Sequence, residues 1–143
     1  MQRIPPRVLV LEDDALVRDV VTEVLSDHGI EVDAAEDAAA ALDKIAERDF
    51  DLIVADVRLP GEIDGTDAVR CARERRPWLR SLFISGKAMP RLTDPAIDEF
   101  IAKPFRSHEL LGCVWELLRR PAREKAEDAA AAGSELSCRS SLS

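Results

Sequence analysis

The sequence predicts an α/β fold: a doubly wound, five-stranded parallel sheet in the order 2-1-3-4-5 with helices on both faces. Short apolar runs alternate along the chain with segments whose apolar residues recur every three or four positions. The runs are continuously apolar, which is typical of strands buried on both sides of a sheet. Because crossover connections between parallel strands are right-handed and carry the helices, this alternation predicts helices on both faces.

The first half of the chain predicts the order strand, helix, strand, helix. Residues 8–11 form a short apolar run that acidic residues stop, and residues 15–28 follow with the period of an amphipathic helix. Gly29 is placed to cap the end of that helix. Residues 30–35 predict a second strand, and residues 37–48 predict a helix whose first residue, an aspartate, is a good N-cap.

The same alternation continues in the second half. Residues 51–56 form a third apolar run that also ends in a carboxylate. The helix after it can be capped by Asp64 or Thr66 and is stopped by Pro77. Residues 80–85 form a fourth apolar run, which predicts the fourth strand.

The end of the chain combines a last strand and helix with a tail of different composition. Residues 99–102 predict the fifth strand, and Ser107 is expected to cap a helix that runs toward Pro121. We therefore predict one domain over residues 1–120. Residues 121–143 contain an alanine run and a serine-rich end with almost no large apolar side chains, so we expect a low-complexity tail that is disordered or a frayed helix.

The composition argues against several classes of function. The 143 residues include 20 basic and 28 acidic side chains, and the net charge of −8 disfavours a nucleic-acid binder held by phosphate contacts. Aromatic residues make up only 4%, which gives no platform for stacking bases. No apolar run approaches the roughly 20 residues that a membrane-spanning helix needs. We therefore expect a cytoplasmic protein that binds neither nucleic acid nor membrane.

Acidic residues follow the first and third predicted strands. Glu12, Asp13 and Asp14 come directly after the first strand, and Asp56 ends the third. In doubly wound sheets, ligands bind outside the carboxyl ends of the strands, at the point between these two strands where the winding reverses. Carboxylates about 4 Å apart repel by about 4 kcal/mol at an effective dielectric constant near 20, so such a cluster favours a bound cation. Oxygen ligands alone predict Mg²⁺ or Mn²⁺.

Two further strand ends bring complementary groups to the same edge. Ser85 ends the fourth strand and Lys103 follows the fifth, so a hydroxyl donor and a cation join the carboxylates. A carboxylate nucleophile at Asp56 could accept a phosphoryl group, with the metal ion and Lys103 neutralising charge on the phosphoryl oxygens. The combination of four strand ends predicts a site for phosphoryl chemistry.

Four motifs give the sequence a resemblance to a known family: Leu-Val-Leu-Glu-Asp-Asp at residues 9–14, Leu-Ile-Val-Ala-Asp-Val-Arg-Leu-Pro-Gly at 52–61, Ile-Ser-Gly at 84–86 and Ala-Lys-Pro-Phe at 102–105. Through these motifs the chain resembles the receiver domain of two-component response regulators, of the stand-alone, CheY-like type. The resemblance covers about residues 5 to 120. It implies a flavodoxin-like fold and phosphorylation of an aspartate.

The resemblance also implies the residues of a Mg²⁺ site. Asp13 would bind the ion directly with Glu12 in support, because the family commonly has an arginine five residues after the metal ligand and Arg18 stands there. Asp56 would contribute its carboxylate, and Arg58 would contribute only its backbone carbonyl. Asp14 lies outside this set.

The remaining roles implied by the resemblance concern the reaction and the switch. Asp56 would be the phosphoacceptor, and Lys103 the lysine that binds the phosphoryl group. Ser85 would be the switch hydroxyl, and Phe100 the aromatic residue whose rotamer follows activation.

The chain departs from the family pattern between the fourth and fifth strands. The spacing from Ser85 to Lys103 is about one helical turn shorter than is usual in the family. Pro90 and Pro95 fall where the fourth helix of the family runs, and proline interrupts helices. We therefore expect a shortened fourth helix and an altered output face.

The function implied by the resemblance is that of a phosphoacceptor in a two-component phosphorelay. The donor would be a histidine kinase or a histidine phosphotransfer protein, and the phosphorylated state would signal to a downstream protein or through a phosphorylation-dependent homodimer. Such a protein catalyses only its own phosphoryl transfer and dephosphorylation and is not otherwise an enzyme. The alternative is a pseudo-receiver that acts only as a protein-interaction module, because the departures lie on the output side.

Two other classes fit the residues less well. A hydrolase of the haloacid dehalogenase type also uses an aspartate at a strand end with Mg²⁺, but that family has a second aspartate where this chain has Arg58. A flavodoxin-like nucleotide binder needs a neutral loop after the first strand, and acidic residues 12–14 would repel a phosphate there.

Overall fold

The structure, a computed structural model, describes residues 4–86, 94 and 96–121. Five parallel strands pair in the order β2-β1-β3-β4-β5, which confirms the predicted sheet. The strands are β1 (Arg7–Leu11), β2 (Glu31–Ala35), β3 (Leu52–Asp56), β4 (Arg80–Ser85) and β5 (Asp98–Ala102). The helices of the described residues are α1 (Ala15–Ser26), α2 (Ala38–Glu47), α3 (Gly65–Arg75) and α4 (Ser107–Arg119).

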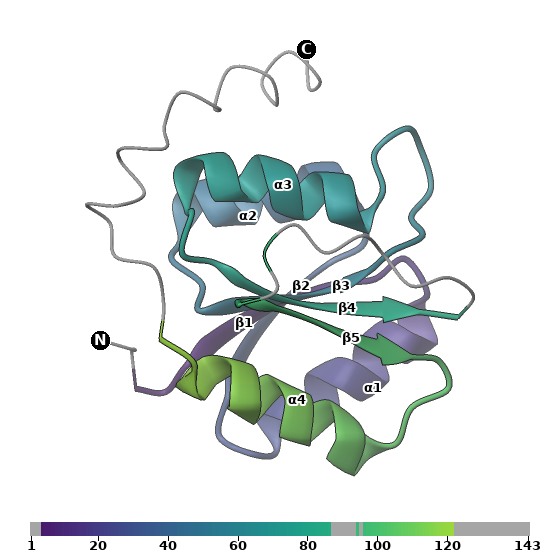
Figure 1. Ribbon diagram of the computed structural model, residues 1–143. Helices are drawn as coiled ribbons and strands as arrows, with labels where there is room; N and C mark the ends of the chain where they lie inside the picture. Colours follow the sequence, from purple (N-terminus) through teal and green to yellow (C-terminus); the bar gives the residue numbers. More distant parts are fainter. Residues whose placement is uncertain (1–3, 87–93, 95, 122–143) are drawn as a thin grey trace.

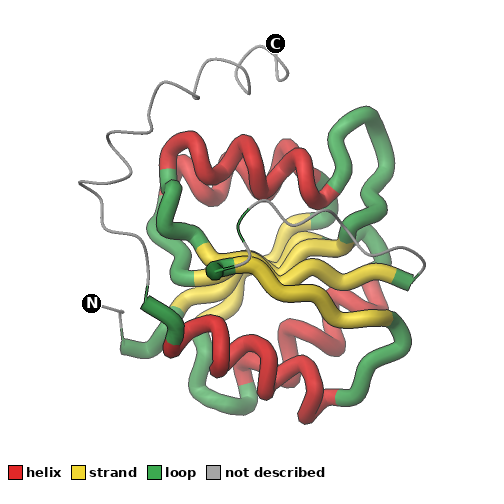
Figure 2. Tube along the Cα trace, viewed as in Figure 1, coloured by secondary structure: helices red, strands yellow, loops and turns green. Residues whose placement is uncertain are grey.

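The helices form two layers with the sheet between them. Helices α1 and α4 cover one face of the sheet, and α2 and α3 cover the other (Figure 1; Figure 2). Successive side chains of a strand point to opposite faces, so β1 contributes to both cores. Val8 and Val10 pack in the core beneath α1 and α4, whereas Leu9 and Leu11 pack beneath α2 and α3. Burial on both faces explains the continuously apolar strands.

The helix starts confirm two of the three predicted N-caps. Asp37 accepts a hydrogen bond from a backbone N–H of the first turn of α2 at 2.8 Å, and Asp64 does so for α3 at 2.9 Å. The prediction for the last helix is wrong, because Ser107 is the first residue of α4 and Arg106 occupies the N-cap position. Glu109 instead accepts the backbone N–H of Arg106 at 2.9 Å, so a side chain from the first turn satisfies this donor.

Helix α1 leaves part of its apolar pattern in contact with solvent. Val21 and Leu25 are buried, but Leu16 is 78% exposed and Val20 is 51% exposed. The recurrence of apolar residues every three or four positions correctly predicts the helix. This spacing does not show which of the apolar residues are buried against another helix or strand.

Two predictions concern residues outside the described part of the chain. The expected shortening of the fourth family helix rests on Pro90 and Pro95, and the predicted tail begins at Pro121, the last described residue. Both stay predictions, as does the boundary of the domain at residue 120. Among the residues that the structure describes, none of the helices has the length and apolar character that a membrane span requires.

A buried ion pair joins three elements at the amino edge of the sheet, where β4 and β5 begin. Arg73 of α3 pairs with Asp98, the first residue of β5, and also donates to the carbonyl of Leu79 at 2.9 Å. The Ser81 hydroxyl of β4 and the backbone N–H of Asp94 donate to the same carboxylate. Burial opposes ionisation of Asp98, but these donors outweigh it and hold the pKa of Asp98 below its usual range.

Candidate functional site

The carboxyl edge of the sheet brings together residues that are far apart in the sequence. Glu12 follows β1 directly, Asp56 is the last residue of β3, and Lys103 follows β5. The sheet order places β3 between β1 and β4, and the backbone N–H of Lys103 donates to the carbonyl of Ser85 at 2.8 Å. Parallel pairing therefore puts the ends of β1, β3, β4 and β5 along one edge, as predicted.

The Lys103 ammonium group connects two buried carboxylates. Its Nζ lies 2.8 Å from Oδ2 of Asp56 and 3.3 Å from Oε2 of Glu12. Burial would lower the pKa of Lys103, but hydrogen bonds and charge attraction from the two carboxylates outweigh it and raise this pKa. Lys103 is therefore a fixed positive charge at the edge of the sheet.

A third carboxylate, that of Asp13, completes an acidic cluster. Glu12, Asp13 and Asp56 each offer one oxygen, and these three oxygens lie within 4.8 Å of one another. Asp13 is exposed, whereas Glu12 is 2% and Asp56 is 6% exposed. Burial, together with the neighbouring Asp56, raises the pKa of Glu12 to about 7. Lys103 balances only part of this negative charge, so the cluster attracts a further cation.

Backbone donors and an arginine fix the chain around Glu12 and Asp56. The backbone N–H of Asp14 donates to Oε1 of Glu12 at 3.2 Å, and that of Arg58 donates to Oδ1 of Asp56 at 3.0 Å. Arg18 reaches back from α1 and donates to the carbonyl oxygen of Glu12 at 2.9 Å. Both carboxylates are therefore oriented by the residues that follow them in the chain.

Helix α3 begins directly against the end of β3. Gly65, its first residue, donates its backbone N–H to the carbonyl of Val57 at 2.9 Å. A Cβ atom at this position would lie 1.9 Å from the carbonyl oxygen of Asp56, a separation that two such atoms cannot adopt. Only glycine allows this close approach, which ties the start of α3 to the backbone of Asp56.

The other predicted site residues lie at or near the same edge. Ser85 is the last residue of β4, the strand next to β3, and is 3% exposed. Phe100 lies within β5, where it pairs with Phe83 and packs against the core beneath α2 and α3. The side chain of Arg58 is exposed, and its backbone contacts Asp56. The structure thus gathers the carboxylates and Lys103, while Phe100 stays inside the sheet.

Two contacts at the site have no counterpart in the sequence prediction. The sequence around Gly65 does not indicate its close approach to Asp56, because a glycine after an N-capping aspartate is an ordinary helix start. The hydrogen bond from Arg18 to the backbone of Glu12 is also unexpected, since a charged residue on a surface helix predicts exposure to solvent.

Residues 8–114 match the family model of the response regulator receiver domain. The chain therefore belongs to the receiver domain family of two-component response regulators, a family of signalling proteins and not typical enzymes. The match includes the acidic cluster and Lys103 and confirms the family predicted from the motifs.

Curated relatives support the same assignment. The response regulator MprA of Mycobacterium sp. (strain KMS) is 34% identical over 131 residues, which cover 89% of this chain and 56% of that protein. MprA of Mycobacterium bovis (strain BCG / Pasteur 1173P2) is 37% identical over 128 residues, covering 87% of this chain and 54% of the relative. This chain spans little more than half the length of these relatives, so the expectation that it does not bind nucleic acid stays a prediction.

Two solved structures share the fold over more than nine tenths of their length. The CheY-like receiver domain protein of Methanospirillum hungatei JF-1 is 29% identical with a TM-score of 0.70, over 79% of this chain and 93% of that chain. The response regulator TrrA of Thermotoga maritima, in complex with Mg²⁺ and BeF, is 30% identical with a TM-score of 0.70, over 78% of this chain and 98% of that chain.

Proposed function

We propose that this chain is the phosphoacceptor of a two-component phosphorelay and that Asp56 is the residue phosphorylated. The observation that carries the proposal is the position of Lys103 between Asp56 and Glu12, with Asp13 beside them. An ionised carboxylate is already a nucleophile and needs no separate base. What it needs is positive charge near the oxygens of the incoming phosphoryl group, and Lys103 supplies it.

The acidic cluster fits Mg²⁺, or Mn²⁺ as an alternative. Asp13 and Asp56 would bind the ion through carboxylate oxygens, with Glu12 in support and the backbone carbonyl of Arg58 as a further ligand. The geometry favours a cation here, because the three carboxylate oxygens lie within 4.8 Å of one another and Lys103 pairs with only two of the carboxylates. When bound, the ion would neutralise charge on the phosphoryl oxygens.

The transfer itself needs few protein groups. One oxygen of Asp56 forms a bond to phosphorus as the phosphorus–nitrogen bond of the phosphohistidine donor breaks, and the electron pair stays on the imidazole nitrogen. The hydrogen bond from the backbone N–H of Arg58 to Oδ1 keeps the carboxylate oriented. Lys103, 2.8 Å from Oδ2, is placed to donate to an oxygen of the transferred group.

Phosphorylation would change the edge of the sheet through Ser85 and Phe100. A phosphoryl group adds roughly 1.5 to 2 negative charges and three strong acceptors. Ser85, on the strand next to Asp56, can donate its hydroxyl to one of them, and its movement would open space for Phe100 to follow. A histidine kinase or a phosphotransfer protein would be the donor, and a downstream protein would bind the changed surface.

The main alternative is a pseudo-receiver that binds partners without accepting a phosphoryl group, and labelling of the protein distinguishes the two. Incubation with acetyl phosphate and Mg²⁺ should add one group of about 80 Da as an acyl phosphate that hydroxylamine removes. Asp56→Asn should add none. Full labelling of this variant, or a label stable to hydroxylamine, would contradict the assignment of Asp56, and no labelling at all would favour the pseudo-receiver.

Lys44, on helix α2, is a matched control for Lys103. Lys103→Ala should slow labelling by acetyl phosphate about tenfold or more, because one charge-assisted hydrogen bond to the phosphoryl group is lost. Lys44→Ala, on α2 and away from the acidic cluster, should label at the rate of the unmodified protein. Equal rates for the two variants would rule out a role of Lys103 in the transfer.

A further inference from the structure

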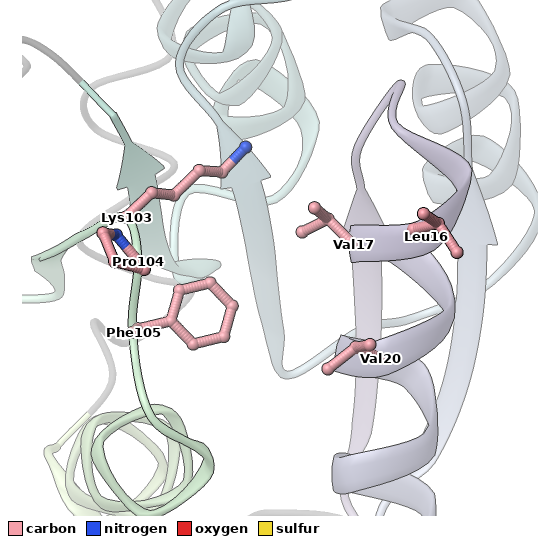
Figure 3. Close-up of a pocket in the computed structure, with 6 residues that line it drawn as sticks. All are labelled: Leu16, Val17, Val20, Lys103, Pro104 and Phe105. Atoms are coloured by element: carbon pink, nitrogen blue, oxygen red, sulfur yellow. The ribbon is translucent and has the colours of Figure 1, made fainter.

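Grooves lie on both helix layers of the described part of the chain. One, of about 430 Å³, lies between α1 and residues 103–105, where Figure 3 shows the Phe105 ring facing Val17 and Val20. Another, of about 200 Å³, lies between α2 and α3 on the other face of the sheet and is here called the α2–α3 groove. The α2–α3 groove contains Cys71 of α3, and a cysteine can hold an occupant covalently.

The α2–α3 groove combines an apolar lining with charged residues. Apolar side chains from both helices line it beside Cys71, namely those of Leu42, Ile45, Ala46 and Ala72. Three charged residues also line it, of which Asp43 and Glu74 are acidic and Arg75 is basic. The groove therefore favours an occupant that brings apolar side chains together with a positive charge.

Cys71 takes part in a disulfide bond, and the sequence leaves one candidate for its partner within the chain. The three cysteines of the chain are Cys71, Cys113 and Cys138. Cys113 is free and belongs to α4, on the opposite face of the sheet from α3 (Figure 1). Cys71 is 8% exposed within a helix, which opposes its direct contact with Cys71 of a second copy. Cys138, which lies outside the described residues, is the remaining candidate.

We propose that Cys71 and Cys138 form a reversible disulfide bond that holds the C-terminal segment, residues 134–143, in the α2–α3 groove. A disulfide bond keeps the two Cα atoms about 4.4 to 6.8 Å apart, so the residues next to Cys138 have to lie against α3. The segment carries Leu136 and Leu142, the two large apolar residues of the last 22, and Arg139 follows Cys138 directly. The leucines suit the apolar lining, and Arg139 suits the two acidic residues of the groove.

The end of α4 is well placed to send the chain to this groove. Arg80, the first residue of β4, donates to the carbonyl of Arg120 at 2.6 Å, so α4 ends at the amino edge of the sheet. Helix α3 reaches the same edge, where Arg73 pairs with Asp98. Cys138 follows the last described residue by 17 positions, which can span roughly 55 Å when extended. This reach exceeds the size of the domain, for which a radius of gyration of about 14 Å is expected.

Formation of the bond needs an oxidant of the disulfide class, such as oxidised glutathione. One cysteine thiolate attacks oxidised glutathione and releases one glutathione thiolate. The second cysteine thiolate then attacks the resulting mixed disulfide and releases the other. The two protein thiols lose two electrons and two protons in total, and oxidised glutathione becomes two molecules of reduced glutathione. Because disulfides in reducing compartments are usually transient and redox-sensing, the bond would fasten the segment on oxidation and release it on reduction.

Thiol counting and peptide mapping of the full chain test the pairing. The protein is equilibrated with reduced or with oxidised glutathione, and the remaining thiols are alkylated in denaturant and counted by mass. After oxidation the unmodified protein should retain one thiol of three, because burial and neighbouring carboxylates raise the pKa of Cys113 and keep it unreactive. Cys138→Ser should retain two thiols, and Cys113→Ser, the matched control, should retain none. A tryptic digest without reductant should contain fragment 71–73 joined to fragment 126–139.

The position of the segment in the groove has a separate test. The ratio of oxidised to reduced protein at a known glutathione ratio gives the equilibrium constant of the disulfide bond. Leu136→Ser/Leu142→Ser should lower this constant about tenfold or more, because the apolar contacts that favour closure are lost. Ala129→Ser/Ala131→Ser, in the alanine run before the segment, is the matched control and should leave the constant unchanged. Both variants keep every residue of the sheet and its helices.

Three thiols in the oxidised protein would overturn the proposal. Fragment 71–73 joined to itself would also overturn it and make a second copy the partner, and fragment 71–73 joined to fragment 107–119 would assign the bond to Cys113. A bond between Cys71 and Cys138 whose constant is the same in the leucine variant and its control would overturn the occupation of the groove. None of these measurements involves phosphorylation, so their outcome is independent of the proposed function.

Discussion

The two edges of the sheet both contain buried charged groups, but they balance these charges differently. At the amino edge, Asp98 pairs with Arg73 and accepts further hydrogen bonds, so groups within the protein balance the negative charge of Asp98. At the carboxyl edge, three carboxylates lie close together, and a single lysine pairs with two of them. The amino edge thus stabilises the fold, whereas the carboxyl edge keeps an excess of negative charge that a ligand can relieve.

The largest effect is expected at the amino edge. Asp98→Asn should lower the free energy of unfolding at pH 7 by about 3 kcal/mol, because breaking a buried ion pair leaves the Arg73 guanidinium without its countercharge. Urea denaturation measures this change. The control is Asp33→Asn, which breaks the more exposed pair with Arg48 and should cost less than about 1 kcal/mol. Equal losses in the two variants would contradict the importance of burial.

The same pair sets a pH dependence of definite sign. The pKa of Asp98 is lower in the folded protein than its ordinary value, so the folded state holds the proton less tightly than the unfolded chain does. The stabilisation is present above the pKa of the unfolded chain and is lost as the pH falls through the pKa of the folded state. The difference in stability between the unmodified protein and Asp98→Asn should therefore shrink in acid and stay constant near neutrality.

A smaller but still large effect is expected where α3 meets the carboxyl edge. Gly65→Ala should destabilise the protein by about 2 kcal/mol or more, because the added Cβ would overlap the backbone of Asp56 and force α3 away from the site. Gly112→Ala is the matched control in the middle of α4, where an added Cβ meets nothing within 4 Å. This control should stabilise the protein by up to about 1 kcal/mol through helix propensity. Thermal or urea unfolding would show whether the two substitutions change the free energy of unfolding in opposite directions.

The sequence predicts the carboxyl edge of the sheet much better than the amino edge. A parallel sheet necessarily collects the carboxyl ends of its strands at one edge, so Glu12, Asp56 and Lys103 could be placed together from the strand pattern alone. Their contacts in the structure agree with that prediction. The amino edge offers no such rule, because the pairing of Arg73 with Asp98 depends on how α3 packs on the sheet.

The local sequence pattern also fails to predict features that depend on how helices and strands pack against one another. The apolar spacing of α1 is the same whether or not another element covers a residue, so the exposure of Leu16 and Val20 could not be predicted. The contact of Gly65 with Asp56 joins two segments whose separation depends on the whole layer of helices. Ser107 shows a third kind of failure, since a good capping residue was available but Glu109 satisfied the donor at the helix start instead.

A metal ion should bind at the carboxyl edge and stabilise the protein by mass action. Mg²⁺ at about ten times its dissociation constant should add about 1.4 kcal/mol to the free energy of unfolding. Asp13→Ala should lose most of this gain, because Asp13 is the exposed member of the acidic cluster and the expected direct ligand. Melting temperatures with and without Mg²⁺ measure both effects, and an unchanged gain in the variant would exclude Asp13 from the metal site.

The smallest effect, and the sharpest contrast between the two edges, is expected for the same variant without metal. Asp13→Ala then removes one carboxylate from the excess at the carboxyl edge and should raise the free energy of unfolding by about 0.5 kcal/mol, since solvent screens an exposed charge. Asp19→Ala, an exposed aspartate on α1 outside the cluster, controls for the general effect of lowering the net charge. Removing a carboxylate would thus destabilise the amino edge and stabilise the carboxyl edge. If chelator-treated Asp13→Ala were instead less stable than Asp19→Ala in urea, the three carboxylates would not repel one another in the free protein, and the need for a bound cation would have to be explained differently.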